Sequence, residues 1–359
     1  MKKIAVIGTV GVPANYGGFE MLVENLLTYK QNPELKYQVY CSKNAYSEHP
    51  NEYKGARLIY LPLKANGAQA LFYDSLSLLH ACFTADMILV LGCSCPIYPL
   101  VKFFCHKRLV VNVDGIETAR DKWSGFAKRV LTFCTKGAIR AADIRVSDNS
   151  AIRDYLLEKY TSDSVVIEYG GDNAFSVRDD NRLKNHYGLR RGKYAFKVAR
   201  IEPENNIEMV LKAFTRMPEM PLVLVGNWNR STYGTDLKTR FASSSNLMLL
   251  DPIYDTYELN LLRSNCRLYI HGHSAGGTNP SLVEAMSLAL PIFAFDVKYN
   301  RATTEGKAYY FDSVHTLCDQ VQSVSDAHLE HVASDMGEIA RRRYCWTTIC
   351  KKYEHLFMI

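Results

Sequence analysis

Short apolar runs alternate with segments of helical spacing through the first half of the chain. The apolar runs predict β-strands at residues 4–7, 37–41, 57–61, 87–91, 109–113, 143–147 and 165–168. Between them, apolar residues recur at helical spacing over residues 19–29 and 68–84. Strands that alternate with helices form a parallel sheet covered by helices on both faces. We therefore expect an α/β fold that binds its ligands beyond the carboxyl ends of the strands.

A second alternation of the same kind follows a charged stretch at residues 178–191, where we place the domain boundary. Its predicted strands are residues 194–199, 222–225, 247–250, 267–270 and 291–295, and its predicted helices are residues 207–216, 255–264 and 280–290. A chain of 359 residues suits two domains. We expect doubly wound, Rossmann-like domains at residues 1–170 and 171–335. Residues 336–359 are expected to form a helix that packs back on the first domain, with Trp346 and Tyr353 available for that contact.

The composition excludes several other classes of protein. No apolar run reaches the roughly 18–20 residues that span a bilayer. The apolar run after Lys2 and Lys3 is too short for a signal peptide, so we expect a cytosolic protein. The ten cysteines include a C-x-C pair, Cys93 and Cys95, but no pair with zinc spacing. We expect them to be small buried hydrophobic residues.

The net charge of +6 is concentrated in one region. Residues 102–140 hold nine basic and three acidic side chains, and this difference of six equals the excess of the whole chain. Within this region, apolar residues recur at helical spacing between basic ones: Phe126, Val130, Phe133 and Cys134. The pattern is typical of an amphipathic helix at an anionic membrane surface. The alternative is a surface helix packed on its own sheet, which explains the aromatic residues but not the charge.

The stretch from His271 to Met286 has the pattern of a phosphate-binding loop. A predicted strand runs into a turn with two glycines, and Asn279 and Pro280 suit the N-cap and the first position of the following helix. Such a turn directs backbone N–H groups and the positive end of a helix dipole at one point. Glu284 follows one turn into the helix, where it can reach a sugar hydroxyl. The alternative is an ordinary, well-capped connection.

Two loops of the first half carry further candidate chemistry. The loop at residues 8–18 does not match G-x-G-x-x-G, and no acidic residue ends the second strand, which disfavours NAD or FAD. Gly17 and Gly18 can still admit an anion or a sugar ring before a helix. Asp114 directly follows a strand and can accept a hydroxyl proton or orient a sugar. The alternative for Asp114 is a turn-forming Asp-Gly pair.

Two tandem domains of this kind resemble the GT-B glycosyltransferases, and most closely the large retaining family 4. That fold has two Rossmann-like domains that face a central cleft. The matching positions are Gly17, Gly18 and Glu20 in a glycine loop, the hinge at residues 169–172, Arg200, Gly226 and Glu284. Gly276 replaces the first Glu of the family's E-x₇-E motif, and Asn205 replaces a Lys. Both changes, and the strings at residues 11–20, 114–117, 200–206 and 276–285, resemble a bacterial rhamnosyltransferase subgroup that acts in capsule and cell-wall polysaccharide assembly.

The resemblance implies retaining transfer of L-rhamnose from dTDP-L-rhamnose to a sugar hydroxyl of a lipid-linked polysaccharide intermediate. Arg200 and Asp114 are the implied catalytic residues. The implied donor-binding residues are Arg200, Asn205, Asp251, Tyr254, Gly276, Gly277, Thr278, Asn279 and Glu284. The residues expected to face the acceptor or a phosphate are Asn15, Tyr16, Gly17, Gly18, Glu20 and Glu117. No D-x-D sequence occurs, so we expect no metal and no cofactor.

Other interpretations stay open at this point. The donor could be a UDP-hexose or a UDP-N-acetylhexosamine, and the protein could bind a nucleotide sugar without turning it over. An epimerase or a sugar kinase has the same fold class, although the chain has no Walker motif. We expect no nucleic-acid partner. The basic region at residues 102–140 predicts a peripheral protein on the inner face of the cytoplasmic membrane, where lipid carriers lie.

Overall fold

The computed structural model describes residues 1–14, 17–113 and 125–359, which divide into two compact units. The first unit contains Met1–Tyr169 together with Trp346–Ile359, and the second contains Gly170–Cys345. The boundary expected at residues 335/336 lies inside a helix, α13 (Asp326–Arg343), and the chain returns to the first unit only after Cys345. The reason is that the buried face of α13 packs on α10 (Pro280–Ser287) of the second unit.

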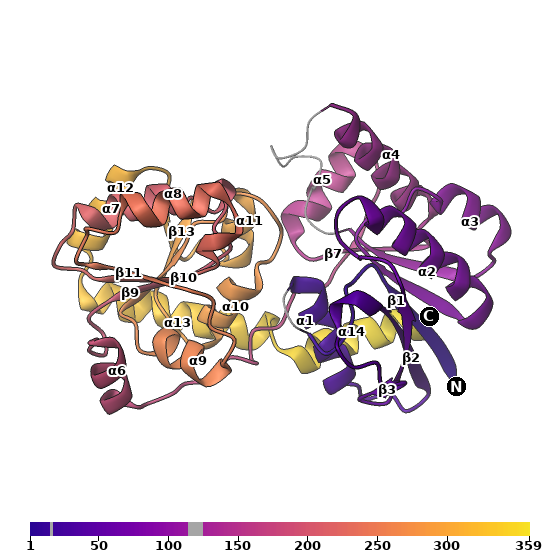
Figure 1. The fold of residues 1–359 in the computed structure, drawn as a ribbon, viewed down its shortest axis with the longest axis horizontal. Coiled ribbons are helices and arrows are strands. Elements are labelled where there is room, and N and C mark those ends of the chain that lie inside the picture. The colour runs from indigo at the N-terminus through magenta and orange to yellow at the C-terminus, as the bar shows by residue number, and fades with distance from the viewer. Residues whose placement is uncertain (15–16, 114–124) are drawn as a thin grey trace. The chain divides into compact units, whose positions relative to one another are not determined.

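The described strands of the first unit form one sheet in the order β3-β4-β2-β1-β5-β6-β7-β8. All neighbours are parallel except β3 and β4. The strands are β1 (Lys2–Ile7), β2 (Leu35–Ser42), β3 (Glu52–Tyr53), β4 (Ala56–Leu61), β5 (Met87–Leu91), β6 (Arg108–Asn112), β7 (Ile144–Ser147) and β8 (Val165–Val166). The helices are α1 (Gly18–Thr28), α2 (Ala70–Thr84), α3 (Tyr98–Phe104), α4 (Gly125–Ala141), α5 (Ser150–Tyr160) and α14 (Trp346–Met358) (Figure 1).

The order of the strands decides which face each helix covers. The chain leaves β1 in one direction along the sheet, through α1 to β2, and returns from β4 in the other direction through α2, α3, α4 and α5. Because crossovers between parallel strands are right-handed, α2 to α5 cover the face opposite to α1. The C-terminal α14 packs beside α1. Its Tyr353 is fully buried and accepts a hydrogen bond from Asn112 Nδ2 at 2.8 Å.

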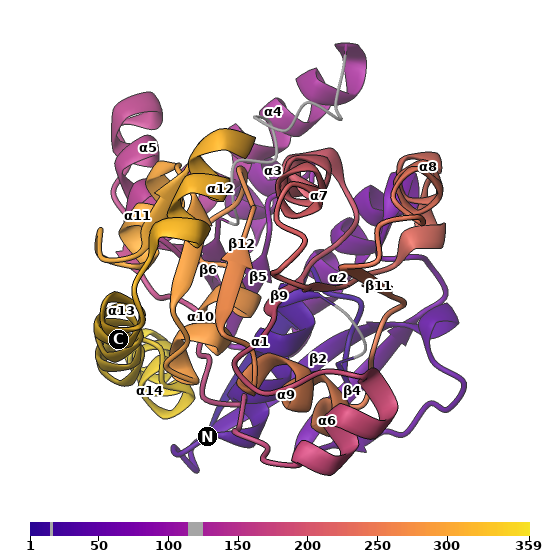
Figure 2. The same cartoon turned by 90° about the vertical axis from the view of Figure 1, so that its left-hand side faces the viewer.

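The second unit repeats the architecture with the strand order β11-β10-β9-β12-β13-β14, all parallel. The strands are β9 (Ala195–Val198), β10 (Leu222–Val225), β11 (Leu247–Leu250), β12 (Leu268–His271), β13 (Ile292–Phe295) and β14 (Tyr309–Phe311). The remaining helices are α6 (Asp180–Tyr187), α7 (Ile207–Thr215), α8 (Thr232–Arg240), α9 (Thr256–Ser264), α11 (Lys298–Thr303) and α12 (Val314–Ser323). Helices α7, α8 and α12 lie on one face, and α9, α10 and α13 lie on the other (Figures 1 and 2).

Two elements of the second unit differ from the sequence-based expectation. The charged stretch at residues 178–191, expected to be only a domain boundary, contains the helix α6. Asp179 caps the start of this helix by accepting a hydrogen bond from Arg182 N at 2.9 Å. Gly188 ends the helix in the left-handed conformation, with φ 66°. The strand β14 follows the one expected as the last. The sequence analysis missed β14 because two of its three residues are tyrosines, which do not form a clear apolar run.

The described residues also bear on membrane insertion and on the cysteines. None of the described helices has the length and apolarity to cross a bilayer. All ten cysteines are thiols outside any disulfide, and seven of them are buried, in agreement with their expected role as small hydrophobic residues.

Candidate functional site

The polar loops of the second unit gather at the point where its strand order reverses. From β9 the chain moves outward to β10 and β11, and it then returns to place β12 on the other side of β9. The loops after β9 and β12 therefore leave the sheet in opposite directions, and the crevice between them is the usual ligand site of such a sheet. The first loop holds Arg200, and the second holds residues 272–279.

Hydrogen bonds between described residues join these two loops. The backbone N–H and the hydroxyl of Ser274 both donate to the Glu204 carbonyl oxygen, at 2.9 and 2.8 Å. Asn206 Nδ2 donates to the Gly272 carbonyl oxygen at 2.9 Å. Asn205 was predicted to contact the donor, but its side chain is buried and donates to the Arg200 carbonyl oxygen at 2.7 Å. The structure thus gives Asn205 a role in shaping the turn that presents Arg200.

Arg200 is the cation best placed to meet an anionic ligand. Its side chain is about one-third exposed, and its ion pair among the described residues is a long one, 3.9 Å from Nη1 to Glu202 Oε2. A guanidinium carries five N–H donors in a planar fork that matches phosphate oxygens. A contact of 3.9 Å leaves most of those donors open to a ligand.

The loop after β12 enters α10 as the sequence predicts. Asn279 caps the helix, since its Oδ1 accepts hydrogen bonds from Ser281 N at 3.1 Å and Ser281 Oγ at 2.8 Å. Pro280 occupies the first turn, where its missing N–H has no cost. Thr278 is buried, whereas Ser274 to Gly277 and Asn279 are partly exposed. Gly276 has φ 122°, a conformation that other residues rarely adopt.

Glu284 is held in place by two donors that the sequence analysis missed. Its Oε2 pairs with Arg263 Nη2 at 2.8 Å, and its Oε1 accepts a hydrogen bond from Asn173 Nδ2 at 2.9 Å. The Arg263 side chain, from α9, is 4% exposed, and the Glu284 side chain is 14% exposed. Each carboxylate oxygen has a second lone pair, so Glu284 can still accept a hydrogen bond from a ligand hydroxyl. The ion pair with Arg263 and the hydrogen bond from Asn173 fix the orientation of the Glu284 carboxylate toward such a hydroxyl.

Two buried basic side chains lie near the carboxyl ends of the two central strands, β9 and β12, from which these loops start. The sequence analysis missed both. Lys197 of β9 and His271 of β12 are both fully buried, and their nitrogens have no hydrogen-bond partner among the described residues. Lys197 Nζ lies 2.8 Å from the point where a Cβ on Gly272 would stand. Burial lowers the pKa of Lys197 to about 7. Burial also holds the pKa of His271 well below its usual range, and the neighbouring Lys197 lowers it further.

Lys197→Met is expected to stabilise the protein, by about 3 kcal/mol at pH 7, because it removes a buried amine without a partner. The native pKa of about 7 lies below the ordinary value of 10.5, so the unfolded chain binds the extra proton between these values. The free energy of unfolding of the wild type should therefore rise with pH across this window. Urea unfolding of both proteins between pH 7 and 10 checks this. We expect the variant's advantage to shrink as pH rises, and an advantage that does not change with pH would contradict the assignment.

The residues predicted to hold the base lie beyond β11. Asp251 follows this strand directly, and its Oδ1 accepts a hydrogen bond from Lys238 Nζ at 3.0 Å. Tyr254 is 72% exposed. An exposed aromatic ring at the carboxyl end of the sheet is available for stacking, so the predicted contact of Tyr254 with the base stays a prediction.

In the first unit, the glycine loop after β1 is braced by Glu20 from α1. The Glu20 carboxylate is buried and accepts hydrogen bonds from Thr9 Oγ1 and Val10 N, both at 2.9 Å. A Cβ on Gly17 would stand 2.0 Å from Glu20 Oε2, and Gly17 has φ 134°, so this position requires glycine. The structure gives Glu20 a role in holding the loop, and its predicted contact with the acceptor stays a prediction. Gly18 opens α1 beside the Tyr169 hydroxyl.

Four of the predicted site residues lie outside the described part of the chain: Asn15, Tyr16, Asp114 and Glu117. Among the described residues, no cluster of three or more His, Cys, Asp or Glu side chains is placed to hold a metal ion.

Two family models match the chain, one in each half. Residues 1–172 match a family described as a domain of unknown function (DUF1972). Residues 179–328, which contain the Arg200 turn, the loop after β12 and Glu284, match the family described as glycosyl transferases group 1. Residues 179–328 thus form a glycosyl transferases group 1 domain, and the chain as a whole has the GT-B fold. No curated protein matches this sequence.

Solved structures share the fold of this chain at low sequence identity. A sucrose-phosphate synthase from Thermosynechococcus elongatus matches with a TM-score of 0.83 and 15% identity, over 100% of this chain and 98% of that one. The Anabaena protein HepE, solved in complex with UDP, matches with a TM-score of 0.77 and 16% identity, over 100% of both chains. An Escherichia coli trehalose-6-phosphate protein bound to UDP-2-fluoro glucose matches with a TM-score of 0.72 and 11% identity, over 99% of both chains. Identities this low establish the fold and leave the substrates of the glycosyltransferase open.

Proposed function

We propose that this glycosyltransferase transfers L-rhamnose from dTDP-L-rhamnose to a sugar hydroxyl of a lipid-linked polysaccharide intermediate. The observation that carries the proposal is the arrangement at the reversal of strand order in the second unit. A partly exposed cation, a glycine loop that enters a capped helix and a fixed carboxylate belong to the loops and the helix at this point, at Arg200, Gly276–Asn279 and Glu284. A nucleoside diphosphate offers the matching chemistry, with its anionic phosphates and its sugar hydroxyls.

In the proposed reaction the bond between the anomeric carbon and the diphosphate oxygen breaks, and its electron pair leaves with the diphosphate. Arg200 and the backbone N–H groups of residues 277–279 stabilise the charge on that leaving group. Glu284 accepts a hydrogen bond from the 3′-hydroxyl of the deoxyribose. The acceptor hydroxyl oxygen forms the new bond on the same face of the sugar and loses its proton. Asp114 is the proposed acceptor of that proton, and the reaction needs no metal or other cofactor.

The choice of dTDP-L-rhamnose rests on the resemblance to the rhamnosyltransferase subgroup, including Gly276. The rival donor is a UDP-sugar, and it has its own support, because two of the similar structures contain UDP or a UDP-glucose analogue. Turnover of dTDP-L-rhamnose, UDP-glucose and UDP-N-acetylglucosamine with a synthetic lipid-linked acceptor separates the two. A protein that binds these donors and turns over none of them would support the non-catalytic alternative.

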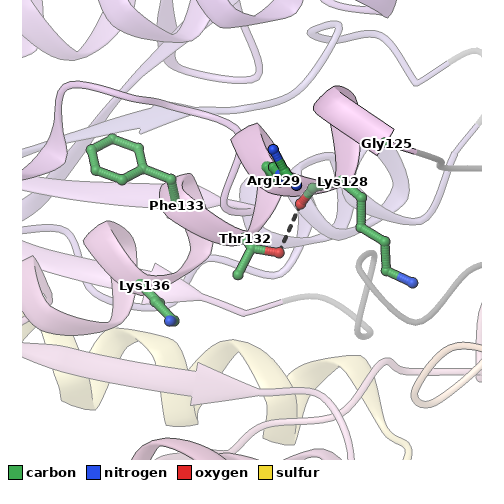
Figure 3. Close-up of a pocket in the computed structure, with 6 residues that line it drawn as sticks. All are labelled: Gly125, Lys128, Arg129, Thr132, Phe133 and Lys136. Atoms are coloured by element: carbon green, nitrogen blue, oxygen red, sulfur yellow. Dashed lines mark hydrogen bonds between the residues drawn. The ribbon is translucent and has the colours of Figure 1, made fainter.

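We infer that the enzyme works at the inner face of the cytoplasmic membrane, because the proposed acceptor is carried by a lipid. Support comes from α4, which is the amphipathic helix predicted from the basic region. One side of α4 forms a shallow pocket of about 470 Å³ lined by Gly125, Lys128, Arg129, Thr132, Phe133 and Lys136. In Figure 3, Lys128 and Phe133 project in different directions from this helix. Exposed lysines beside an exposed aromatic ring suit contact with anionic headgroups.

A further inference from the structure

Helix α2 turns an apolar stripe to the solvent. Phe72, Leu76, Leu79 and Phe83 are 67%, 49%, 43% and 88% exposed. Their spacing places them along one side of the helix, while its opposite side is buried against β1 and β5. A surface helix of a soluble domain normally presents polar residues on its outer side. Exposed apolar patches of this kind mark surfaces that contact a membrane, a ligand or another protein.

No charged side chain interrupts the stripe. The acidic residue of α2, Asp74, is buried, and the helix contains no lysine or arginine. His80 is the exposed polar neighbour within the stripe. The outer side of α2 thus lacks the charged side chains that a solvent-exposed helix usually carries.

Helix α3 extends the stripe. Phe103 and Phe104 are 77% and 69% exposed, and their rings contact each other edge to face, with centroids 4.9 Å apart. The C-terminal ends of the two helices are near each other. Burial raises the pKa of the Cys82 thiol of α2, and the Cys105 thiol, directly after α3, is close enough to raise it further. We call the surface formed by Phe72, Leu76, Leu79, Phe83, Phe103 and Phe104 the α2–α3 face.

The surroundings of the α2–α3 face are basic. Helices α3 and α4 contain no Asp or Glu, and they carry Lys102, Lys128, Arg129, Lys136 and Arg140. The two helices pack closely, since a Cβ on Gly137 of α4 would stand 3.4 Å from Pro99 Cδ of α3. Lys102 pairs with Asp143, at 2.5 Å from Nζ to Oδ1, so the positive charge beside the α2–α3 face comes from the four bases of α4, a helix without a carboxylate.

We propose that the α2–α3 face inserts into the boundary between the headgroups and acyl chains of an anionic bilayer. The phenylalanine and leucine side chains leave water, and the lysines and arginines of α4 contact headgroup phosphates. A second copy of the chain fits this surface poorly, because a two-fold interface would bring two cationic rims together. The inference rests on the proposed membrane location of the enzyme, and it adds an apolar anchor to the electrostatic contact.

The test is sedimentation of the full chain with lipid vesicles. The wild type is expected to bind vesicles that contain about 30% phosphatidylglycerol and to keep part of that binding in about 0.5 M salt. The double variant Phe72→Ser/Phe83→Ser should bind about tenfold or more weakly and lose the salt-resistant part. Phe175→Ser, which changes a 47%-exposed phenylalanine of the second unit, is the matched control and should bind like the wild type. Thermal unfolding confirms that each variant is folded.

Two outcomes would overturn the proposal. One is vesicle binding by Phe72→Ser/Phe83→Ser equal to that of the wild type. The other is a wild type that does not bind vesicles but self-associates, together with a double variant that is monomeric. The α2–α3 face would then be an interface between two copies of the chain. Turnover of the donor with a water-soluble acceptor should be unchanged in the double variant. The vesicle experiment does not depend on glycosyl transfer, so it can distinguish a failure of the membrane proposal from a failure of the proposed activity.

Discussion

Replacing Arg200 with alanine is expected to lower kcat/KM for the donor by about a hundredfold or more, because the diphosphate then leaves without its principal cation. The fold should be unaffected, since the guanidinium makes one long ion pair, to Glu202, among the described residues. Arg190→Ala is the matched control, because Arg190 is an exposed arginine just before β9. Steady-state kinetics at saturating acceptor check the prediction. Full activity in Arg200→Ala would remove this residue from the mechanism.

A second large effect is expected at the buried pair of Arg263 and Glu284. Arg263→Met leaves a mostly buried carboxylate without its cation, which should cost about 3–5 kcal/mol and lower the melting temperature by about 10 °C. Glu284→Gln should also destabilise the protein, since it leaves the buried Arg263 uncompensated, and it should raise the KM for the donor. The double variant Arg263→Met/Glu284→Gln contains neither buried charge. It should therefore be more stable than either single variant, while its affinity for the donor should stay low.

The control for this pair is Arg301→Met, which breaks the exposed ion pair with Asp296 and should leave the melting temperature near the wild-type value. The melting temperatures of the four variants and the wild type provide the comparison. Strictly additive effects of Arg263→Met and Glu284→Gln would show that the two side chains do not act as a pair.

The sequence predicted the strands and the entry to α10 because those features are local. Apolar runs such as Met87–Leu91 are buried on both faces, and Asn279 with Pro280 has the chemistry of a helix start in any context. The α/β fold followed from the order of these elements.

The contacts that fix the candidate site could not be predicted in the same way. Glu284 meets Arg263 and Asn173, which lie on other elements far away in the sequence, and no spacing links them. Lys197 sits in an apolar strand pattern that predicts burial but gives no reason for a buried amine. The exposed stripe of α2 was missed for a related reason. That helix is apolar on both sides, and only the packed structure shows which side is buried.

The most direct test of the account is transfer of labelled L-rhamnose from dTDP-L-rhamnose to a synthetic lipid-linked acceptor, with UDP-glucose and UDP-N-acetylglucosamine run in parallel. The account predicts a rhamnosylated product from the wild type, little product from Arg200→Ala and little transfer from either UDP-sugar. Efficient transfer from a UDP-sugar, with none from dTDP-L-rhamnose, would contradict the proposed donor.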